Sequence, residues 1–180
     1  MSRRSAGVRF RAFAPLAYPL FYRLPHRMRV RLVRLVSPTF TVGAVVLVRD
    51  AEAPEPGRLL LLRQPPGRGW SLPAGLLARG ETPVAGAVRE LAEESGVRLR
   101  PDQLRQADPA VLVHHRGRWV DLVFEASVPA STTPLVVDGA EVLEAAWHPV
   151  DDLPPLTRPT ARLLAHYGIG PQVERDPGRV

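Results

Sequence analysis

Residues 75–97, GLLARGETPVAGAVRELAEESGV, constrain the fold most, because they describe a helix with both ends marked. Thr82 is a residue type that caps helix N-termini, Pro83 suits the first helical position, and Gly96 suits a left-handed C-terminal cap. These signals predict a helix over about 83–95. Its apolar residues lie on one stripe, which must pack against another layer of structure. The stripe consists of Val84, Ala87, Val88 and Leu91.

Glutamates form a second stripe on the same predicted helix. Glu90, Glu93 and Glu94 lie near its C-terminus, where the helix dipole favours cations, and like charges at this spacing destabilise a helix by roughly a few tenths of a kcal/mol per pair. A solvated acidic face is one explanation, but it does not account for Gly75 and Gly80 just before the helix. The alternative is a hard divalent cation such as Mg²⁺, which takes oxygen ligands.

The same segment resembles the Nudix box, G-x5-E-x7-R-E-U-x-E-E-x-G-U, in which U is a bulky aliphatic residue. Its nine constrained positions, which make the match specific, all agree. They are Gly75, Glu81, Arg89, Glu90, Leu91, Glu93, Glu94, Gly96 and Val97. A weaker resemblance extends over residues 40–155. The resemblance implies a Nudix hydrolase with an α/β (α+β) fold, an α/β/α sandwich around a mixed β-sheet.

The resemblance also implies a reaction and a role for each glutamate of the box. Nudix hydrolases cut the diphosphate linkage between a nucleoside and another moiety. Glu93 and Glu94 would be the main metal ligands, Glu90 a ligand or the base that activates water, and Glu81 a further carboxylate near the metal. The implied cofactor is Mg²⁺, with Mn²⁺ as an alternative.

Other residues would complete the site that the resemblance implies. Arg89 would hold the glutamates by ion pairing, and Gly75 would bring its backbone carbonyl near the metal. A carboxylate from outside the box often assists in this family. Glu125, Glu141 and Glu144 are candidates, and Glu141, in a predicted loop before the last strand, is preferred as the base.

Several residues near the box are candidates for contacting the substrate. Arg63, Arg68 and Arg79 could each bind phosphate through two hydrogen bonds, although surface solubility explains them equally well. Trp70 could stack on a base, but a core or loop-anchor role is favoured. We expect a nucleotide or another nucleoside diphosphate-linked small molecule as the substrate. A Nudix-like module that senses a nucleotide without turnover is the alternative, and the complete glutamate set argues against it.

The rest of the sequence predicts a mixed sheet and a further helix. Apolar runs at 40–49, 58–63 and 142–150 read as strands. The runs 110–116 and 119–128, which flank Gly117, read as a hairpin, and 101–109 reads as a loop before it. Strands, a helix, a hairpin, a strand and a second helix in this order predict a layered domain. We expect the domain to span residues 39–170 and to be followed by a loose tail, 171–180.

Basic charge is concentrated in an N-terminal arm, residues 1–38. Residues 1–49 contain ten Arg and no Asp or Glu, and the whole chain has a formal charge of +6. Within the arm, residues 26–36 alternate apolar side chains and arginines with the period of an amphipathic helix. We favour packing of its apolar stripe on the domain or on the second subunit of a homodimer. Contact with an anionic membrane or with nucleic acid is the alternative.

The composition excludes several classes of site and of location. The chain has no cysteine, so any metal must be held by oxygen or histidine ligands. It has no run of about 18 apolar residues that could cross a membrane. Arginine interrupts every short apolar run near the start, so no secretory signal is expected and the sequence predicts a cytoplasmic protein.

Overall fold

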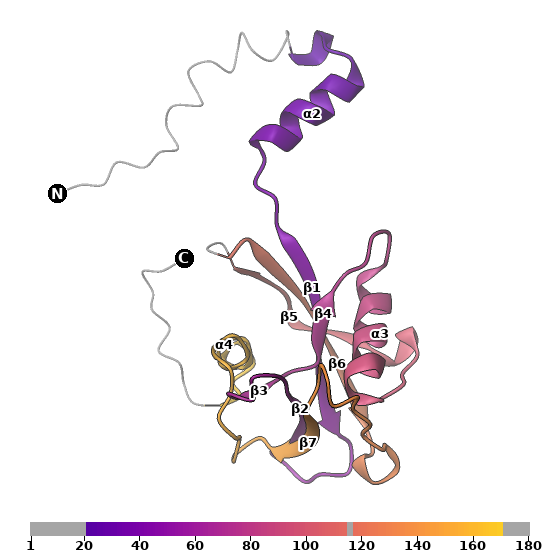
Figure 1. Cartoon of the computed structure of the whole chain (residues 1–180), viewed down its shortest axis with the longest axis vertical. Helices are drawn as coiled ribbons and strands as arrows, with labels where there is room; N and C mark the ends of the chain where they lie inside the picture. Colours follow the sequence, from indigo (N-terminus) through magenta and orange to yellow (C-terminus); the bar gives the residue numbers. More distant parts are fainter. Residues whose placement is uncertain (1–20, 115–116, 171–180) are drawn as a thin grey trace, which may run out of the picture. The chain divides into compact units, whose positions relative to one another are not determined.

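The structure is a computed structural model that describes residues 21–114 and 117–170 (Figure 1). The chain divides into two compact units, with the boundary between Thr39 and Phe40. The predicted tail, 171–180, and the first part of the predicted arm, 1–20, lie outside the described residues. Within the described residues, no helix is both long enough and apolar enough to span a bilayer.

The first unit contains the helix α2 (His26–Val36), which matches the predicted amphipathic helix. The helix ends because Ser37, which precedes Pro38, has the extended backbone that a residue before proline prefers. Met28, Leu32 and Leu35 on its apolar side are exposed. What covers this side stays a prediction, as does the homodimer.

The second unit is built on one sheet, to which the described residues contribute seven strands. The strands are β1 (Thr41–Asp50), β2 (Arg58–Arg63), β3 (Trp70–Ser71), β4 (Ala74–Leu76), β5 (Arg105–His114), β6 (Trp119–Val128) and β7 (Glu144–Pro149). β1 lies at the centre and pairs in parallel with β6, from Thr41 opposite Trp119 to Asp50 opposite Val128. The other pairings are antiparallel, so the predicted mixed sheet is confirmed.

The strands β4 and β7 lie off the main path of the sheet. The main path is β3-β2-β1-β6-β5, while β4 pairs with β1 and β7 pairs with β2. The predicted hairpin is present as β5 and β6, but β5 begins five residues before the predicted start at Ala110. A register shift between Gln106 and Val111 interrupts the alternation of side chains between the two faces of the strand. This explains why residues 101–109 were predicted as a loop.

One face of the sheet is covered by α4 (Arg158–Ala165), the predicted C-terminal helix. Because successive strand residues point to opposite faces, Val45 and Leu47 of β1 share this side. They belong to one buried cluster with Leu163 and Leu164 of α4.

The opposite face is covered by α3 (Pro83–Ser95), the acidic helix predicted from the sequence. Ala44 and Val46 of β1 pack in a second cluster with Ala87 and Leu91 of α3. Burial of one leucine such as Leu91 stabilises the fold by about 1.5–3 kcal/mol. Figure 1 shows α3 and α4 on the two sides of the sheet, which confirms the α/β/α sandwich.

The ends of α3 follow the predicted signals. Thr82 accepts a hydrogen bond from the backbone N–H of Ala85, Pro83 is the first helical residue, and Gly96 has a φ of 76°. Such a φ favours glycine, and the Gly96 N–H closes the last turn on the carbonyl of Ala92 at 3.0 Å. The short helices η2 (Pro101–Gln103) and η3 (Ala130–Thr132) lie in the later connections.

Candidate active site

Gly75 of β4 brings the sheet against the carboxylate of Glu90. Ala44 of β1 pairs with Gly75, which fixes the position of β4 beside α3. A Cβ atom built on Gly75 would lie only 1.9 Å from Cδ of Glu90. A side chain at this position would therefore displace the carboxylate, so only glycine permits this close approach.

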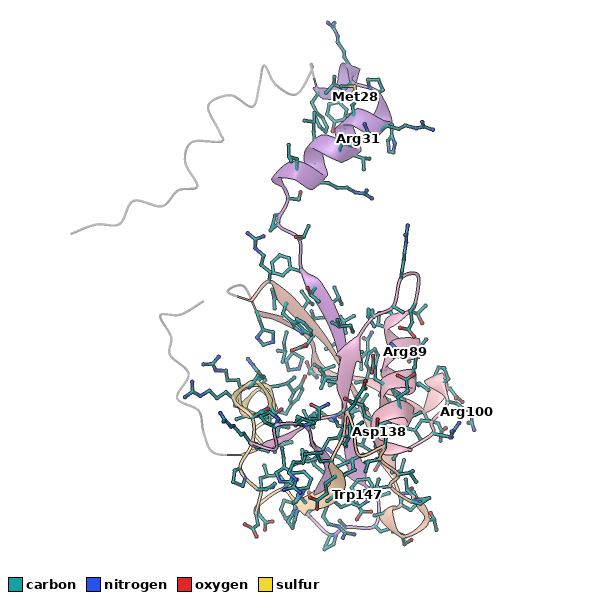
Figure 2. All side chains as sticks on the ribbon, viewed as in Figure 1. Met28, Arg31, Arg89, Arg100, Asp138 and Trp147 are labelled. Atoms are coloured by element: carbon teal, nitrogen blue, oxygen red, sulfur yellow. The ribbon has the colours of Figure 1, made fainter. Side chains whose placement is uncertain are left out.

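Arg89, which is labelled on α3 in Figure 2, forms ion pairs with three of the four glutamates of the box. Its Nε and Nη2 atoms donate to the two carboxylate oxygens of Glu81, each at 3.0 Å. Its Nη1 atom donates to Glu93 at 3.0 Å and forms an ion pair with Glu90 at 2.8 Å. Nη2 also donates to the carbonyl of Leu76 on β4, at 3.1 Å. The arginine therefore offsets the repulsion among the three carboxylates.

These contacts change the acidity of the paired groups. Hydrogen bonds from Arg89, and one from the backbone N–H of Ala78, hold the pKa of Glu81 below its usual value. The same bonds to Glu81, followed by those to Glu90, raise the pKa of Arg89. Both shifts favour the charged forms, so Arg89 and Glu81 form a fixed ion pair beside the start of α3.

Glu94 differs from the other three glutamates because it is buried and has no ion-pair partner among the described residues. It accepts hydrogen bonds from the backbone N–H of Ala74 at 2.9 Å and from Nε2 of Gln64 at 2.7 Å. Burial raises the pKa of Glu94 to about 7, and the charges of Glu90 and Glu141 raise it as well. A positive charge placed beside this carboxylate would therefore be stabilised.

Glu141 lies in the loop before β7, where its charge acts on Glu94. The loop is held by Asp138, whose Oδ1 atom accepts hydrogen bonds from the backbone N–H groups of Ala140, Glu141 and Val142 at 3.0, 3.1 and 3.2 Å. Figure 2 shows Asp138 near the C-terminal half of α3. The structure thus brings the charge of Glu141 close to the box.

The other two candidate carboxylates are Glu144 and Glu125. Glu144, the first residue of β7, forms an ion pair with Arg63 at 2.7 Å, because Arg63 and Glu144 face each other in the β2–β7 pairing. Glu125 lies on β6. Burial of the phenol is the main cause that raises the pKa of Tyr167, and the charge of Glu125 raises it further.

The residues predicted to contact the substrate have different surroundings in the structure. Arg63 is occupied by Glu144 and lies over the ring of Trp70, 5.9 Å from its centroid. Trp70 packs edge-on against His148 with ring centroids 4.3 Å apart, which fits the loop-anchor role favoured from the sequence. Arg79 is exposed in the loop between β4 and α3.

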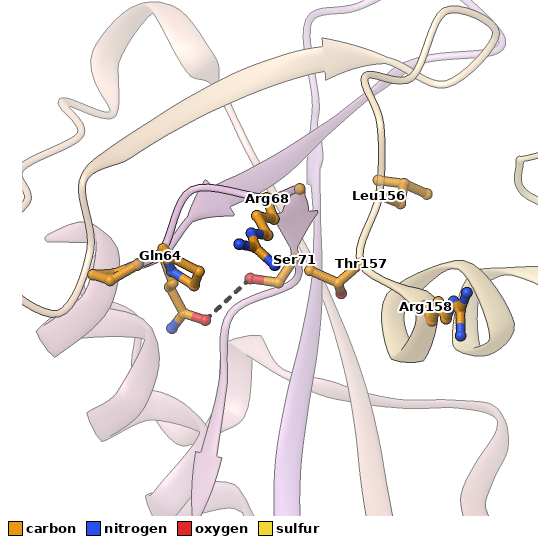
Figure 3. A pocket seen from close by; sticks show the side chains of 9 residues that line it. Gln64, Arg68, Ser71, Leu156, Thr157 and Arg158 are labelled. Carbon is orange, nitrogen blue, oxygen red and sulfur yellow. Dashed lines mark hydrogen bonds between the residues drawn. The ribbon is translucent and has the colours of Figure 1, made fainter.

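Arg68 lines a cavity of about 470 Å³ between β3 and the start of α4 (Figure 3). The cavity is lined by Gln64, Pro65, Pro66, Arg68, Gly69, Ser71, Leu156, Thr157 and Arg158. Sequence reasoning missed Gln64, Ser71 and Arg158, because they come from separate elements and share no local motif. A hydrogen bond of 3.3 Å from Ser71 Oγ to Gln64 Oε1 connects two walls of the cavity.

The carboxylates of the box have the chemistry that a divalent cation requires, but not yet the arrangement. Glu94 supplies a buried carboxylate without a cationic partner, and oxygen donors of this kind suit hard ions such as Mg²⁺. In the part of the chain that the structure describes, however, no three acidic or histidine side chains are gathered into a metal site. Glu81, Glu90 and Glu93 are instead paired with Arg89. The chemistry of the donors fits the ion, and Glu90 and Glu93 would have to turn from Arg89 to reach it.

Comparison with known proteins places the chain in a family. The model of the NUDIX domain family matches residues 39–167. The chain is 38% identical over 87 residues to a human 8-oxo-dGDP phosphatase, a match that covers 47% of this chain and 25% of the human protein. The chain spans less than half of the length of the curated relatives that it matches.

Solved structures show the same fold. The NUDIX domain of NrtR from Shewanella oneidensis, complexed with ADP ribose, superposes with a TM-score of 0.62 at 16% identity, covering 81% of this chain and 97% of that one. A MutT NUDIX hydrolase from Burkholderia pseudomallei gives a TM-score of 0.54 at 27% identity, covering 71% and 95%. With the family match over residues 39–167 and the complete box, these likenesses confirm the resemblance, and the chain belongs to the Nudix family.

Proposed function

We propose that this chain is a metal-dependent pyrophosphohydrolase that cleaves the diphosphate linkage of a nucleotide or of another nucleoside diphosphate derivative. The observation that carries the proposal is the environment of Glu94. Its carboxylate is buried, lies near the charges of Glu90 and Glu141, and has no ion-pair partner among the described residues. An uncompensated carboxylate of this kind suits a catalytic centre better than a structural role.

The proposed cofactor is Mg²⁺, with Mn²⁺ as the alternative. Glu90, Glu93 and Glu94 would hold it, with Glu81 and the backbone carbonyl of Gly75 close by. When bound, such an ion neutralises phosphate charge and lowers the pKa of a coordinated water molecule.

The side chains of the box would divide the remaining work. Glu93 has an exposed fraction of 60%, so it can turn from Arg89 toward a ligand at little cost in burial. Arg89 would meanwhile keep its two hydrogen bonds to Glu81 and so hold the loop before α3 in place. We propose Glu141 as the group that accepts the proton from the attacking water, because its charge acts on Glu94 and its loop is held by Asp138.

The comparisons support the proposed class of substrate. The relatives include a phosphatase of 8-oxo-dGDP and a domain complexed with ADP ribose, and both compounds contain a nucleoside diphosphate. Of the predicted contacts, Arg68 is the best placed, because it lines the cavity that Gln64 connects to Glu94. We further propose that residues 39–170 form the hydrolase domain, that the arm 1–38 lies outside it, and that the protein acts in the cytoplasm.

A nucleotide-sensing module without turnover is the second candidate function. It is favoured by one observation, namely that Arg89 pairs with Glu90 and Glu93 and that the described residues do not gather a complete metal site. Both functions require nucleotide binding, but only the hydrolase requires every glutamate of the box.

The test is release of phosphate, nucleoside monophosphate or pyrophosphate in the presence of Mg²⁺. The panel should contain ADP-ribose, nucleoside triphosphates, dinucleoside polyphosphates and coenzyme A. We expect turnover of at least one compound and its severe loss in Glu94→Gln and Glu93→Gln, with folding retained. Binding without turnover across the panel would instead support the sensing module.

A further inference from the structure

We propose that the cavity between β3 and α4 binds a phosphoryl group of the substrate that lies outside the cleaved diphosphate linkage, through Arg68 and Arg158. The inference rests on the proposed function, and it narrows the substrate class. The substrate would carry a phosphoryl group in addition to those at the scissile linkage.

The two arginines come from different elements but line the same cavity. Arg68 lies in the loop before β3, and Arg158 is the first residue of α4. Figure 3 shows both side chains at the cavity, together with Ser71 and Thr157. The volume of about 470 Å³ lies within the range of small-molecule sites, roughly 300–1,000 Å³, so it can hold more than a single ion.

The wall that carries Arg158 is fixed to the sheet. The backbone N–H of Trp70 donates to the carbonyl of Pro155, and the N–H of Thr157 donates to the carbonyl of Trp70, both at 2.9 Å. A Cβ atom on Gly69 would lie 3.0 Å from the nitrogen of Thr157, so glycine allows this close contact. The cavity is therefore preorganised by backbone contacts rather than by its charged side chains.

Both guanidinium groups are available to a ligand. Arg68 and Arg158 are exposed, and neither forms an ion pair with any residue that the structure describes, unlike Arg63 and Arg89. None of the described residues that line the cavity is acidic. Planar guanidinium groups match the oxygens of a phosphoryl group with two parallel hydrogen bonds, so two unpaired arginines favour a doubly charged group.

Gln64 places the cavity beside the candidate active site. Its side chain lines the cavity, donates to Glu94 at 2.7 Å and accepts from Ser71 at 3.3 Å. One substrate could therefore reach both regions, with the scissile linkage at the glutamates and a second phosphoryl group in the cavity. A terminal phosphate of a polyphosphate chain and a phosphate on a sugar would be equivalent ligands.

The experiment compares pairs of compounds that differ by one phosphoryl group. Binding to the full chain is measured by calorimetry without a divalent cation, so that no turnover is needed. ATP and ADP test a terminal phosphate, and NADPH and NADH test a phosphate on the ribose. We expect one pair to show a preference of about tenfold or more for the compound with the additional phosphoryl group. Hydrogen bonds between charged groups contribute enough binding free energy for such a ratio. The preference should fall in Arg68→Gln and in Arg158→Gln, and vanish in the double variant.

Arg162→Gln is the matched control, because Arg162 is exposed on the same helix and does not line the cavity. It removes the same charge and should keep the preference. The proposal is overturned if the wild type shows no preference in either pair, or if the double variant keeps it. Failure of the hydrolase function would appear separately, as an absence of turnover in the wild type.

Discussion

The carboxylate of Glu90 lies where a side chain on Gly75 would have to stand, with Cδ of Glu90 1.9 Å from the ideal Cβ position. Gly75→Ala should therefore displace the carboxylate and lower kcat by about a hundredfold, as misplacement by roughly 1 Å can do. The measurement is steady-state kinetics with Mg²⁺. Gly117→Ala is the control, since a Cβ there meets nothing within 4 Å. Equal rates in the two variants would contradict the account.

Arg89 should matter through geometry as well as charge. Arg89→Gln removes the hydrogen bonds to Glu81 and Glu93 and leaves repelling carboxylates, so both activity and stability should fall. Since its side chain is one-third exposed, we expect a loss of only about 1 kcal/mol in the free energy of unfolding, measured by urea denaturation. Arg89→Lys keeps the charge but cannot form the paired bonds to Glu81, so its kcat should stay well below the wild-type value. A fully active lysine variant would show that charge alone is sufficient.

Glu94 should make the protein less stable as the pH rises. Its pKa in the folded state, about 7, lies above the ordinary value of 4.5. Its contribution to stability is therefore fully present below pH 4.5 and is lost as the pH rises through about 7. In the presence of a chelator, Glu94→Gln should remove this loss, which is on the order of 3 kcal/mol.

The pH dependence is measured by urea denaturation between pH 4 and pH 8. Glu93→Gln is the control, because it removes an exposed carboxylate of the same helix and leaves Glu94 in place. At pH 8, Mg²⁺ should raise the melting temperature of the wild type but not that of Glu94→Gln. Identical pH profiles for wild type and Glu94→Gln would show that burial does not govern this carboxylate.

Asp138 should act through Glu141. Hydrogen bonds from the N–H groups of Val142, Ala140 and Glu141 lower the pKa of Asp138, so the charged carboxylate holds the loop at neutral pH. Asp138→Ala should lower kcat about tenfold, and Asp138→Asn should restore part of it because the amide oxygen can still accept. If Asp138 acts only by positioning, adding Asp138→Ala to Glu141→Gln should cause little further loss. Additive losses in the double variant would mean that the two residues act independently.

Local signals in the sequence predicted much of this molecule. The limits of α3 follow from Thr82, Pro83 and Gly96, whose preferences act within one turn of the chain. Glu93 lies one turn after Arg89 on α3, so helix geometry alone brings this pair together. The start of β5 was missed because the irregularity before Val111 interrupts the alternation from which a strand is read.

Contacts between distant segments could not be predicted in the same way. Arg63 was a candidate for binding phosphate, but the β2–β7 pairing places it opposite Glu144. The hydrogen bond from Gln64 to Glu94 depends on how α3 docks on the sheet, and the cavity that Arg68 and Arg158 share depends on how β3 and α4 dock. No spacing in the sequence contains that information.

The most direct test of the central claim is calorimetric titration of the full chain with Mn²⁺ or Mg²⁺ at neutral pH, with a non-hydrolysable diphosphate compound present. The account predicts saturable binding to the wild type, with affinity lowered at least tenfold in Glu94→Gln and in Glu93→Gln. An absence of cation uptake by the wild type, or an affinity in both variants equal to that of the wild type, would contradict it.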